Sequence, residues 1–249
     1  PALFLNACSD NFTSVNTHPL EPTAVSEDPL FTRSQRKAML SYVVWQRAEH
    51  LYANMFAQHF ANPIPSFPTD RYEVQNAWLT AYWDAAYSGF GKDIQQVINQ
   101  TRGNTQKQDK LAQARIWQVF VMHRLTDFFG DVPYSQAFKG NPTPAYDQQE
   151  SIYRDLFAKL DTSVSELGGA DQVSFGQNDL IYQGNAQRWK KFANSLRLRM
   201  AMRVSEVDGD LARQQAQAAV NGSGGLISSN DEAATMTPTG DNFSDWNPL

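Results

Sequence analysis

The feature that most constrains the fold is the helical spacing of apolar residues, which recurs in segments separated by loops rich in proline and glycine. Side chains that repeat every three or four residues share one face of an α-helix, and no convincing series of alternating strands is visible. The first such segment is apolar on two sides, as expected for a helix between neighbours. Helices are predicted over about residues 34–61, 72–100, 111–128, 148–167, 189–204 and 210–220.

Long helices joined by short turns predict a mainly α fold. We expect a helical-repeat, tetratricopeptide-like α-α superhelix with long loops, and a packed helical bundle is the alternative, since no clean repeat of about 34 residues is found. Gly89 and Gly91 are expected to break or bend the second helix, and Gly130 to end the third. Asp147 with Glu150 predicts a capping box at the start of the fourth.

Charge and reactive side chains argue against several classes of function. The net charge of −5 and the pI near 5.4 argue against nucleic acid as a partner, because phosphate binding requires an excess of Lys and Arg. The four histidines lack metal-ligand spacing, so neither a metal nor a cofactor is predicted. No phosphate loop or nucleophile elbow is found, and the chain is not expected to be an enzyme. A glycosidase carboxylate pair stays open, because folding can bring two distant acidic residues together.

The single cysteine, Cys8, ends a short apolar segment, residues 1–8, that precedes a polar stretch. This pattern is typical of the end of a signal peptide, and residues 5–8 (LNAC) resemble a bacterial lipobox, in which the cysteine is lipidated. The alternative is a lone buried cysteine in an ordinary N-terminal strand. Acyl chains on Cys8 would hold the protein on a membrane without a spanning helix, and no later segment is long and apolar enough to span one. Residues 9–33, which are polar and contain three prolines, are predicted to form an extended tether.

Three segments together resemble one family. Residues 114–120 (ARIWQVF) lead into residues 125–134 (LTDFFGDVPY), which is similar to a helix that ends in an aromatic-Gly-Asp-Val-Pro turn. Residues 189–203 (WKKFANSLRLRMAMR) resemble a later helix with a Trp-Lys-x-Phe-Ala-Asn-Ser-Leu core. With the lipobox-like start, these segments resemble the SusD/RagB family, in its SusD-like branch. Because family members are longer, residues 34–249 are expected to be the N-terminal part of a SusD-like helical domain whose C-terminal half is missing.

The resemblance implies a non-enzymatic, tetratricopeptide-like lipoprotein on the surface of the outer membrane of a Bacteroidetes-type bacterium. It also implies capture of an oligosaccharide, or in some members a peptide, and delivery of this nutrient to a TonB-dependent SusC-like transporter. A helical-repeat scaffold that binds only protein is the first alternative. A helical glycoside hydrolase is the second.

Aromatic side chains in loops are the candidates for sugar contact, because an exposed flat ring can stack on a sugar ring. The candidates are Phe67 and Tyr72 around the first loop, Tyr134 after the Gly-Asp-Val-Pro turn, and Trp246 near the end. Burial is the more common fate of an aromatic residue, and Trp78, at helical spacing, is predicted to lie in the core. Residues 130–133 are interpreted as a helix stop in which Asp131 accepts backbone hydrogen bonds. The basic side chains of residues 189–203 are expected to be solvated or paired locally.

Overall fold

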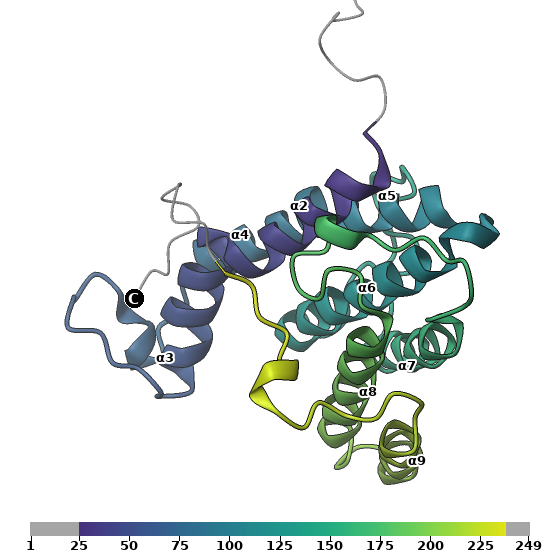
Figure 1. Ribbon diagram of the computed structural model, residues 1–249. Coiled ribbons are helices and arrows are strands. Elements are labelled where there is room, and N and C mark those ends of the chain that lie inside the picture. The colour runs from purple at the N-terminus through teal and green to yellow at the C-terminus, as the bar shows by residue number, and fades with distance from the viewer. Residues whose placement is uncertain (1–24, 238–249) are drawn as a thin grey trace, which may run out of the picture.

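The computed structural model describes residues 25–237, which form helices around a common core (Figure 1). Consecutive helices pack on each other, and the predicted mainly α fold of helical pairs is confirmed. The β contact found in this range is an isolated bridge between Val132 and Asp147. The α-helices are α2 (Glu27–Leu40), α3 (Asn54–Phe56), α4 (Asn76–Asp84), α5 (Gly91–Thr101), α6 (Gln108–Phe129), α7 (Gln149–Glu166), α8 (Ala186–Arg203) and α9 (Gly209–Val220).

Shorter or differently wound helices connect these elements. Two of them are π-helices that continue neighbouring α-helices, η1 (Val43–Ala53) and η3 (Ala85–Phe90). The other four are 3₁₀ helices: η2 (Pro68–Arg71), η4 (Thr105–Lys107), η5 (Gly176–Asn178) and η6 (Asn230–Glu232). Across the described range, each helix is too short or too polar to cross a membrane.

Helix α2 already begins at Glu27, so the predicted end of the extended tether at residue 33 is wrong. Pro29 occupies the first turn of the helix, where a backbone N–H has no intrahelical partner, so the proline is tolerated there. Leu30 and Phe31 are fully buried and belong to the core. The helix ends at Ser41, whose backbone is extended, and the chain continues into η1.

The second predicted helix is divided by a kink. Gly89 takes non-helical dihedral angles (φ −117°, ψ −108°), which confirms the expected break and separates α4 and η3 from α5. The helix also starts later than predicted, because Tyr72 has a left-handed backbone (φ 62°) and ends η2. A side chain at Gly91 would meet the backbone oxygen of Ala86 at 2.5 Å, so this tight connection requires glycine.

Helix α6 lies at the centre of the molecule and contacts α5, α7 and α8 (Figure 1). Its side chain Trp117 is 1% exposed and donates a hydrogen bond to the hydroxyl of Ser34 on α2. The hydroxyl of Ser34 donates in turn to the carbonyl of Phe90. This buried chain of hydrogen bonds fixes α2, η3 and α6 relative to one another, because an unpaired buried polar group would be costly.

The helix that carries the Trp-Lys-x-Phe-Ala-Asn-Ser-Leu sequence, α8, holds the segment that follows α9. Asn194 is 1% exposed, and its amide donates to the carbonyls of Ser223 and Gly225. The hydroxyl of Ser195 accepts from the N–H of Ile227. Three basic residues of the helix form ion pairs with acidic residues of other elements, and not with neighbours in sequence as expected: Lys191 with Glu232, Arg197 with Asp161, and Arg203 with Asp127.

Candidate functional site: a polar cavity beside an aromatic surface

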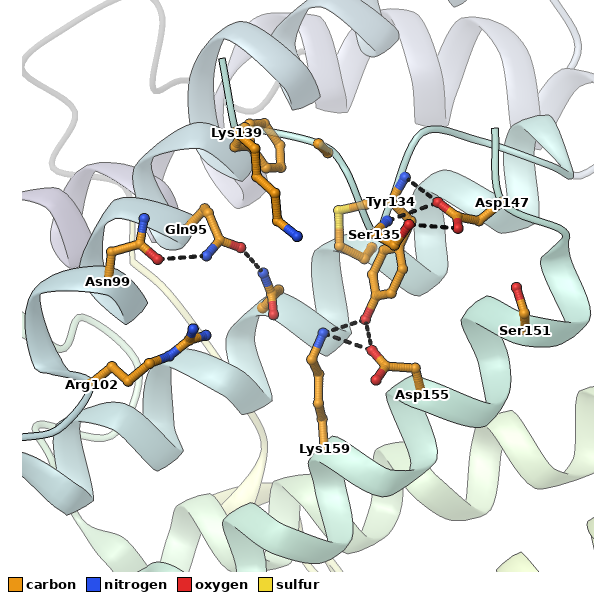
Figure 2. Close-up of a pocket in the computed structure, with 14 residues that line it drawn as sticks. Gln95, Asn99, Arg102, Tyr134, Ser135, Lys139, Asp147, Ser151, Asp155 and Lys159 are labelled. Carbon is orange, nitrogen blue, oxygen red and sulfur yellow. Dashed lines mark hydrogen bonds and ion pairs between the residues drawn. The ribbon is translucent and has the colours of Figure 1, made fainter. Parts of the chain in front are cut away.

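A cavity of about 460 Å³ lies between α5, α6, α7 and the loop that follows Gly130 (Figure 2). Its size falls in the range of about 300–1,000 Å³ that is usual for small-molecule sites. Most of its lining side chains carry hydrogen-bonding groups. The polar lining residues are Gln95, Asn99, Arg102, Gln118, Tyr134, Ser135, Lys139, Asp147, Ser151, Asp155 and Lys159. The apolar lining residues are Met122, Ala137 and Phe138.

The loop that closes one side of the cavity is fixed by two aspartates. Gly130 ends α6 with a positive φ of 72°, as predicted. Asp131 accepts a hydrogen bond from the N–H of Gln149 at the start of α7, so its predicted role as a backbone acceptor is confirmed. The predicted capping box is wrong, because Asp147 does not cap α7 and instead accepts hydrogen bonds from the loop.

Asp147 anchors the start of the cavity wall through three hydrogen bonds. Its carboxylate accepts from the N–H groups of Tyr134 and Ser135 and from the Ser135 hydroxyl, at 2.7–3.0 Å. Burial acts to raise the pKa of Asp147, but these hydrogen bonds and the charge of Lys139 outweigh it and hold the pKa below its usual value. The carboxylate is therefore ionised near neutral pH, and its oxygens accept hydrogen bonds from Tyr134 and Ser135.

Tyr134, one of the predicted ligand residues, points into the cavity and joins a polar triad there (Figure 2). Its hydroxyl donates to Asp155 and accepts from the ammonium of Lys159, which also forms an ion pair with Asp155 at 2.8 Å. Burial, followed by the charge of Asp155, raises the pKa of Tyr134. Burial lowers the pKa of Lys159. The three side chains satisfy one another and form a rigid wall.

The opposite wall is a row of amides. Gln118 donates to Gln95 at 2.8 Å, and Gln95 donates to Asn99 at 3.0 Å. This row leaves the side-chain oxygen of Gln118 and the side-chain nitrogen of Asn99 without a hydrogen bond to any described residue. Both groups are available to the hydroxyls of a ligand.

An aromatic surface adjoins the cavity. The rings of Trp83 and Tyr146 lie nearly parallel with their centroids 6.1 Å apart, and Tyr146 is 63% exposed. Tyr87 contacts Trp83, donates its hydroxyl to the carbonyl of Pro133, and packs on Phe138, which lines the cavity. The aromatic rings thus lead directly to the polar cavity. This combination of flat apolar rings and hydrogen-bonding groups suits a sugar.

The other predicted ligand residues do not join this site. Phe67 is half-buried against Trp78, with ring centroids 5.8 Å apart, and Tyr72 is 61% exposed with its edge against Phe56. Both lie around the loop between α3 and α4, at the opposite end of the molecule from α7 (Figure 1). Cys8 and Trp246 lie outside the described residues.

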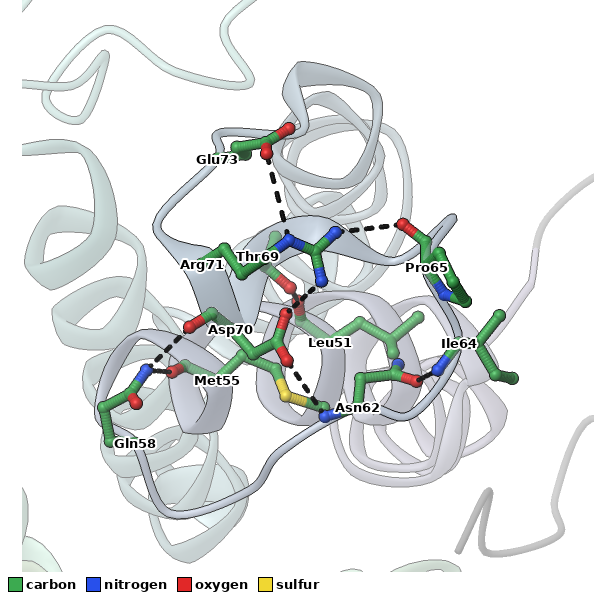
Figure 3. Close-up of polar contacts among 10 residues, drawn as sticks. All are labelled: Leu51, Met55, Gln58, Asn62, Ile64, Pro65, Thr69, Asp70, Arg71 and Glu73. Atoms are coloured by element: carbon green, nitrogen blue, oxygen red, sulfur yellow. Dashed lines mark hydrogen bonds and ion pairs between the residues drawn. The ribbon is translucent and has the colours of Figure 1, made fainter.

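The loop between α3 and α4 is held by its own polar contacts (Figure 3). Thr69, which is fully buried, donates to the carbonyl of Leu51, and Asp70 accepts from the N–H of Asn62 at 3.2 Å. Trp78 is half-buried and lies outside the core, so its prediction as a core residue is wrong. These contacts give the loop a structural function, and its aromatic residues pack on Phe56 of α3 and Trp78 of α4.

The aromatic surface was not predicted from the sequence, because Trp83 and Tyr146 are far apart along the chain. Two signals were available: the spacing of Trp83 and Tyr87 by four residues on one helix, and the position of Tyr146 in a proline-containing loop. Among residues 25–237, no group of three His, Cys, Asp or Glu side chains is arranged to hold a metal ion.

Comparison with known proteins gives a consistent set of matches. A family model described as "Starch-binding associating with outer membrane" matches residues 19–248. A chitin-binding protein of known structure shares 33% identity and a TM-score of 0.78, over 86% of this chain and 46% of that one. A chitin-binding SusD homologue from Flavobacterium johnsoniae shares 31% identity and a TM-score of 0.73, over 84% of this chain and 45% of that one.

A SusD homologue from Parabacteroides distasonis gives a similar result, with 28% identity and a TM-score of 0.78. The alignment covers 88% of this chain and 43% of that one. The chain therefore spans less than half the length of these solved relatives. A search of curated proteins gave no match.

Proposed function

The chain belongs to the SusD-like family described as starch-binding and associating with the outer membrane, and from this premise we propose that it captures a glycan at the cell surface. The observation that carries the proposal is the aromatic surface of Trp83 and Tyr146, which leads into the amide-lined cavity. Two of the similar solved proteins are named as chitin-binding. Their names support a glycan, and not a peptide, as the ligand.

Each part of the site would contact a different part of a sugar chain. A pyranose ring has an apolar face, which would stack on the exposed ring of Tyr146 beside Trp83. The hydroxyls of the next sugar would exchange hydrogen bonds with Gln118 and Asn99 in the cavity. The site binds without turnover in this proposal, because Asp147 and Asp155 are both occupied by hydrogen bonds from the protein.

The first prediction is that Trp83→Ala or Tyr146→Ala weakens glycan binding about tenfold or more, since truncation of a central Trp or Tyr in a binding surface costs about 2 kcal/mol or more. Calorimetric titration of the full-length protein with chitin and starch oligosaccharides measures the effect. Tyr72→Ala is the matched control, because Tyr72 is about equally exposed but packs against Phe56 and does not line the cavity.

Two outcomes would contradict the proposed site. Unchanged affinity in Tyr146→Ala, with loss in Tyr72→Ala, would place the site at the loop between α3 and α4. Binding of peptides and of no glycan in the panel would overturn the glycan as ligand. Tyr146 is the more exposed of the two rings, so its variant is the safer one for folding.

The proposal extends to the location and the partner of the protein. Lipidation of Cys8 would anchor it on the outer membrane, residues 9–26 would connect the anchor to α2, and residues 27–249 would form part of the SusD-like helical domain. A TonB-dependent SusC-like transporter would then receive the glycan. Copurification of this transporter with the full-length protein tests the partner. If the full-length protein copurifies with the transporter but binds no ligand, it would be a scaffold.

A further inference from the structure

The side chains that line the cavity include three cations and two carboxylates, so the lining carries a net positive charge. Three cationic side chains line it from three elements: Arg102 after α5, Lys139 in the loop, and Lys159 on α7. Figure 2 shows the ends of Lys139, Arg102 and Lys159 directed toward the same space. Two carboxylates, Asp147 and Asp155, face these cations.

Both carboxylates are committed to other partners. Asp147 accepts three hydrogen bonds from Tyr134 and Ser135, and it feels the charge of Lys139 without forming an ion pair with it. Asp155 accepts from Tyr134 and pairs with Lys159. The negative charge therefore stays on one side of the cavity, where it holds the loop and α7 together.

The remaining two cations have no such partner. Within residues 25–237, neither Arg102 nor Lys139 makes a side-chain hydrogen bond or an ion pair. Arg102 is close enough to lower the pKa of Lys159, together with burial and the charge of Arg115. Arg115 is neutralised by Glu166 at 2.5 Å, so the positive field in the cavity comes from Arg102 and Lys139. Two cationic side chains that line one cavity from different elements favour an anion inside it.

Resting on the proposed function, we propose that this cavity selects an acidic sugar. Arg102 and Lys139 contact the carboxylate of a uronic acid or the sulfate of a sulfated sugar, and the amide row contacts its hydroxyls. The neighbouring sugar of the same chain stacks on Trp83 and Tyr146. Arginine suits this contact, because its guanidinium binds carboxylate and sulfate oxygens in pairs.

The test compares matched glycans on the full-length protein. A uronic acid oligosaccharide is compared with its carboxyl-reduced form, and a sulfated oligosaccharide with its desulfated form. We expect one acidic form to bind about tenfold or more tightly than its neutral match, since a hydrogen bond to a charged group contributes about 1.5–3 kcal/mol. The pair that shows the difference identifies the anion, and added salt should reduce the difference.

Arg102→Met and Lys139→Met remove the charge and keep the length of each side chain. In both variants the affinities for the acidic form and for its neutral match should become equal. Arg213→Met on α9 is the control, because the side chain of Arg213 is 71% exposed and does not line the cavity. Its preference should equal that of the unchanged protein.

The failure of this inference is distinguishable from that of the proposed function. Equal binding of acidic and neutral glycans, still weakened by Tyr146→Ala, would overturn the acidic selectivity and leave glycan capture intact. A preference that survives in Arg102→Met and Lys139→Met together would place the anion elsewhere. Binding of no glycan in the panel would overturn both.

Discussion

At the scale of single residues, Asn194 shows how one side chain fixes a distant segment. Its amide donates at 3.0 Å to the carbonyls of Ser223 and Gly225, and a side chain at Gly222 would meet its oxygen at 2.6 Å. The segment after α9 therefore passes directly over Asn194, with glycine at the closest point. Asn194, the asparagine of the Trp-Lys-x-Phe-Ala-Asn-Ser-Leu sequence, therefore holds the segment after α9 against α8.

The second prediction concerns this contact. Asn194→Ala should lower the free energy of unfolding by about 1–3 kcal/mol, because the carbonyls of Ser223 and Gly225 lose their partly buried hydrogen bonds to this side chain. Urea denaturation followed by circular dichroism measures the change. Asn221→Ala is the matched control, since Asn221 lies nearby in sequence but is exposed, and it should change stability by less than about 0.5 kcal/mol. Equal effects of the two substitutions would contradict the assigned role.

At the scale of elements, α2 is joined to α6 by charge at its N-terminus. Glu27 forms ion pairs with Lys107 at 2.6 Å and Lys110 at 3.2 Å. Burial acts to raise the pKa of Glu27, but the bonds from Lys107 and Lys110 and its own backbone N–H outweigh this and lower the pKa from 4.5 to about 2. The position in the first helical turn also favours a negative charge.

The third prediction is a dependence on pH with a defined sign. Because the pKa of Glu27 is lower in the folded state than in the unfolded state, its contribution is complete above about pH 4.5 and is lost as the pH falls toward about 2. The free energy of unfolding should therefore fall less between about pH 5 and pH 3 in Glu27→Gln than in the unchanged protein. Glu150→Gln is the control, since Glu150 also lies in a first turn but is exposed. A slope in Glu27→Gln equal to that of the unchanged protein would contradict the assignment.

Helices could be predicted where the apolar periodicity and the residues that begin or end a helix lie within one segment of the chain. Helix α6 was expected from about Leu111 to Phe128 and extends over Gln108–Phe129. The start of α2 was missed because Pro29 reads as a loop residue, although a first helical turn accepts it. The site was mostly missed, since it depends on the approach of Trp83 to Tyr146 and on a cavity whose lining comes from several elements. Such contacts arise from tertiary packing, which no local spacing encodes.

At the scale of the whole molecule, the described helices separate two ends with different properties. The cavity lies between α5, α6 and α7, and its aromatic surface includes Trp83 at the end of α4 and Tyr146 before α7. The loop between α3 and α4 lies at the opposite end of the molecule from α7 (Figure 1). Helix α2 contacts α5 and α6, so residue 27 marks where the N-terminal segment joins this core. A lipid anchor at Cys8 would be joined to this core through residues 9–26.

The last prediction tests this anchor. The full-length protein, expressed in a Bacteroidetes-type host, should incorporate an alkyne-labelled fatty acid and fractionate with the outer membrane. Cys8→Ser should abolish both, because each buried acyl CH₂ contributes about 0.8 kcal/mol to membrane binding and several are needed to hold a domain. Ser14→Ala, in the same N-terminal segment, is the control and should keep both. Labelling that persists in Cys8→Ser would place the anchor elsewhere, and unlabelled protein in the soluble fraction would argue for Cys8 as an ordinary buried residue.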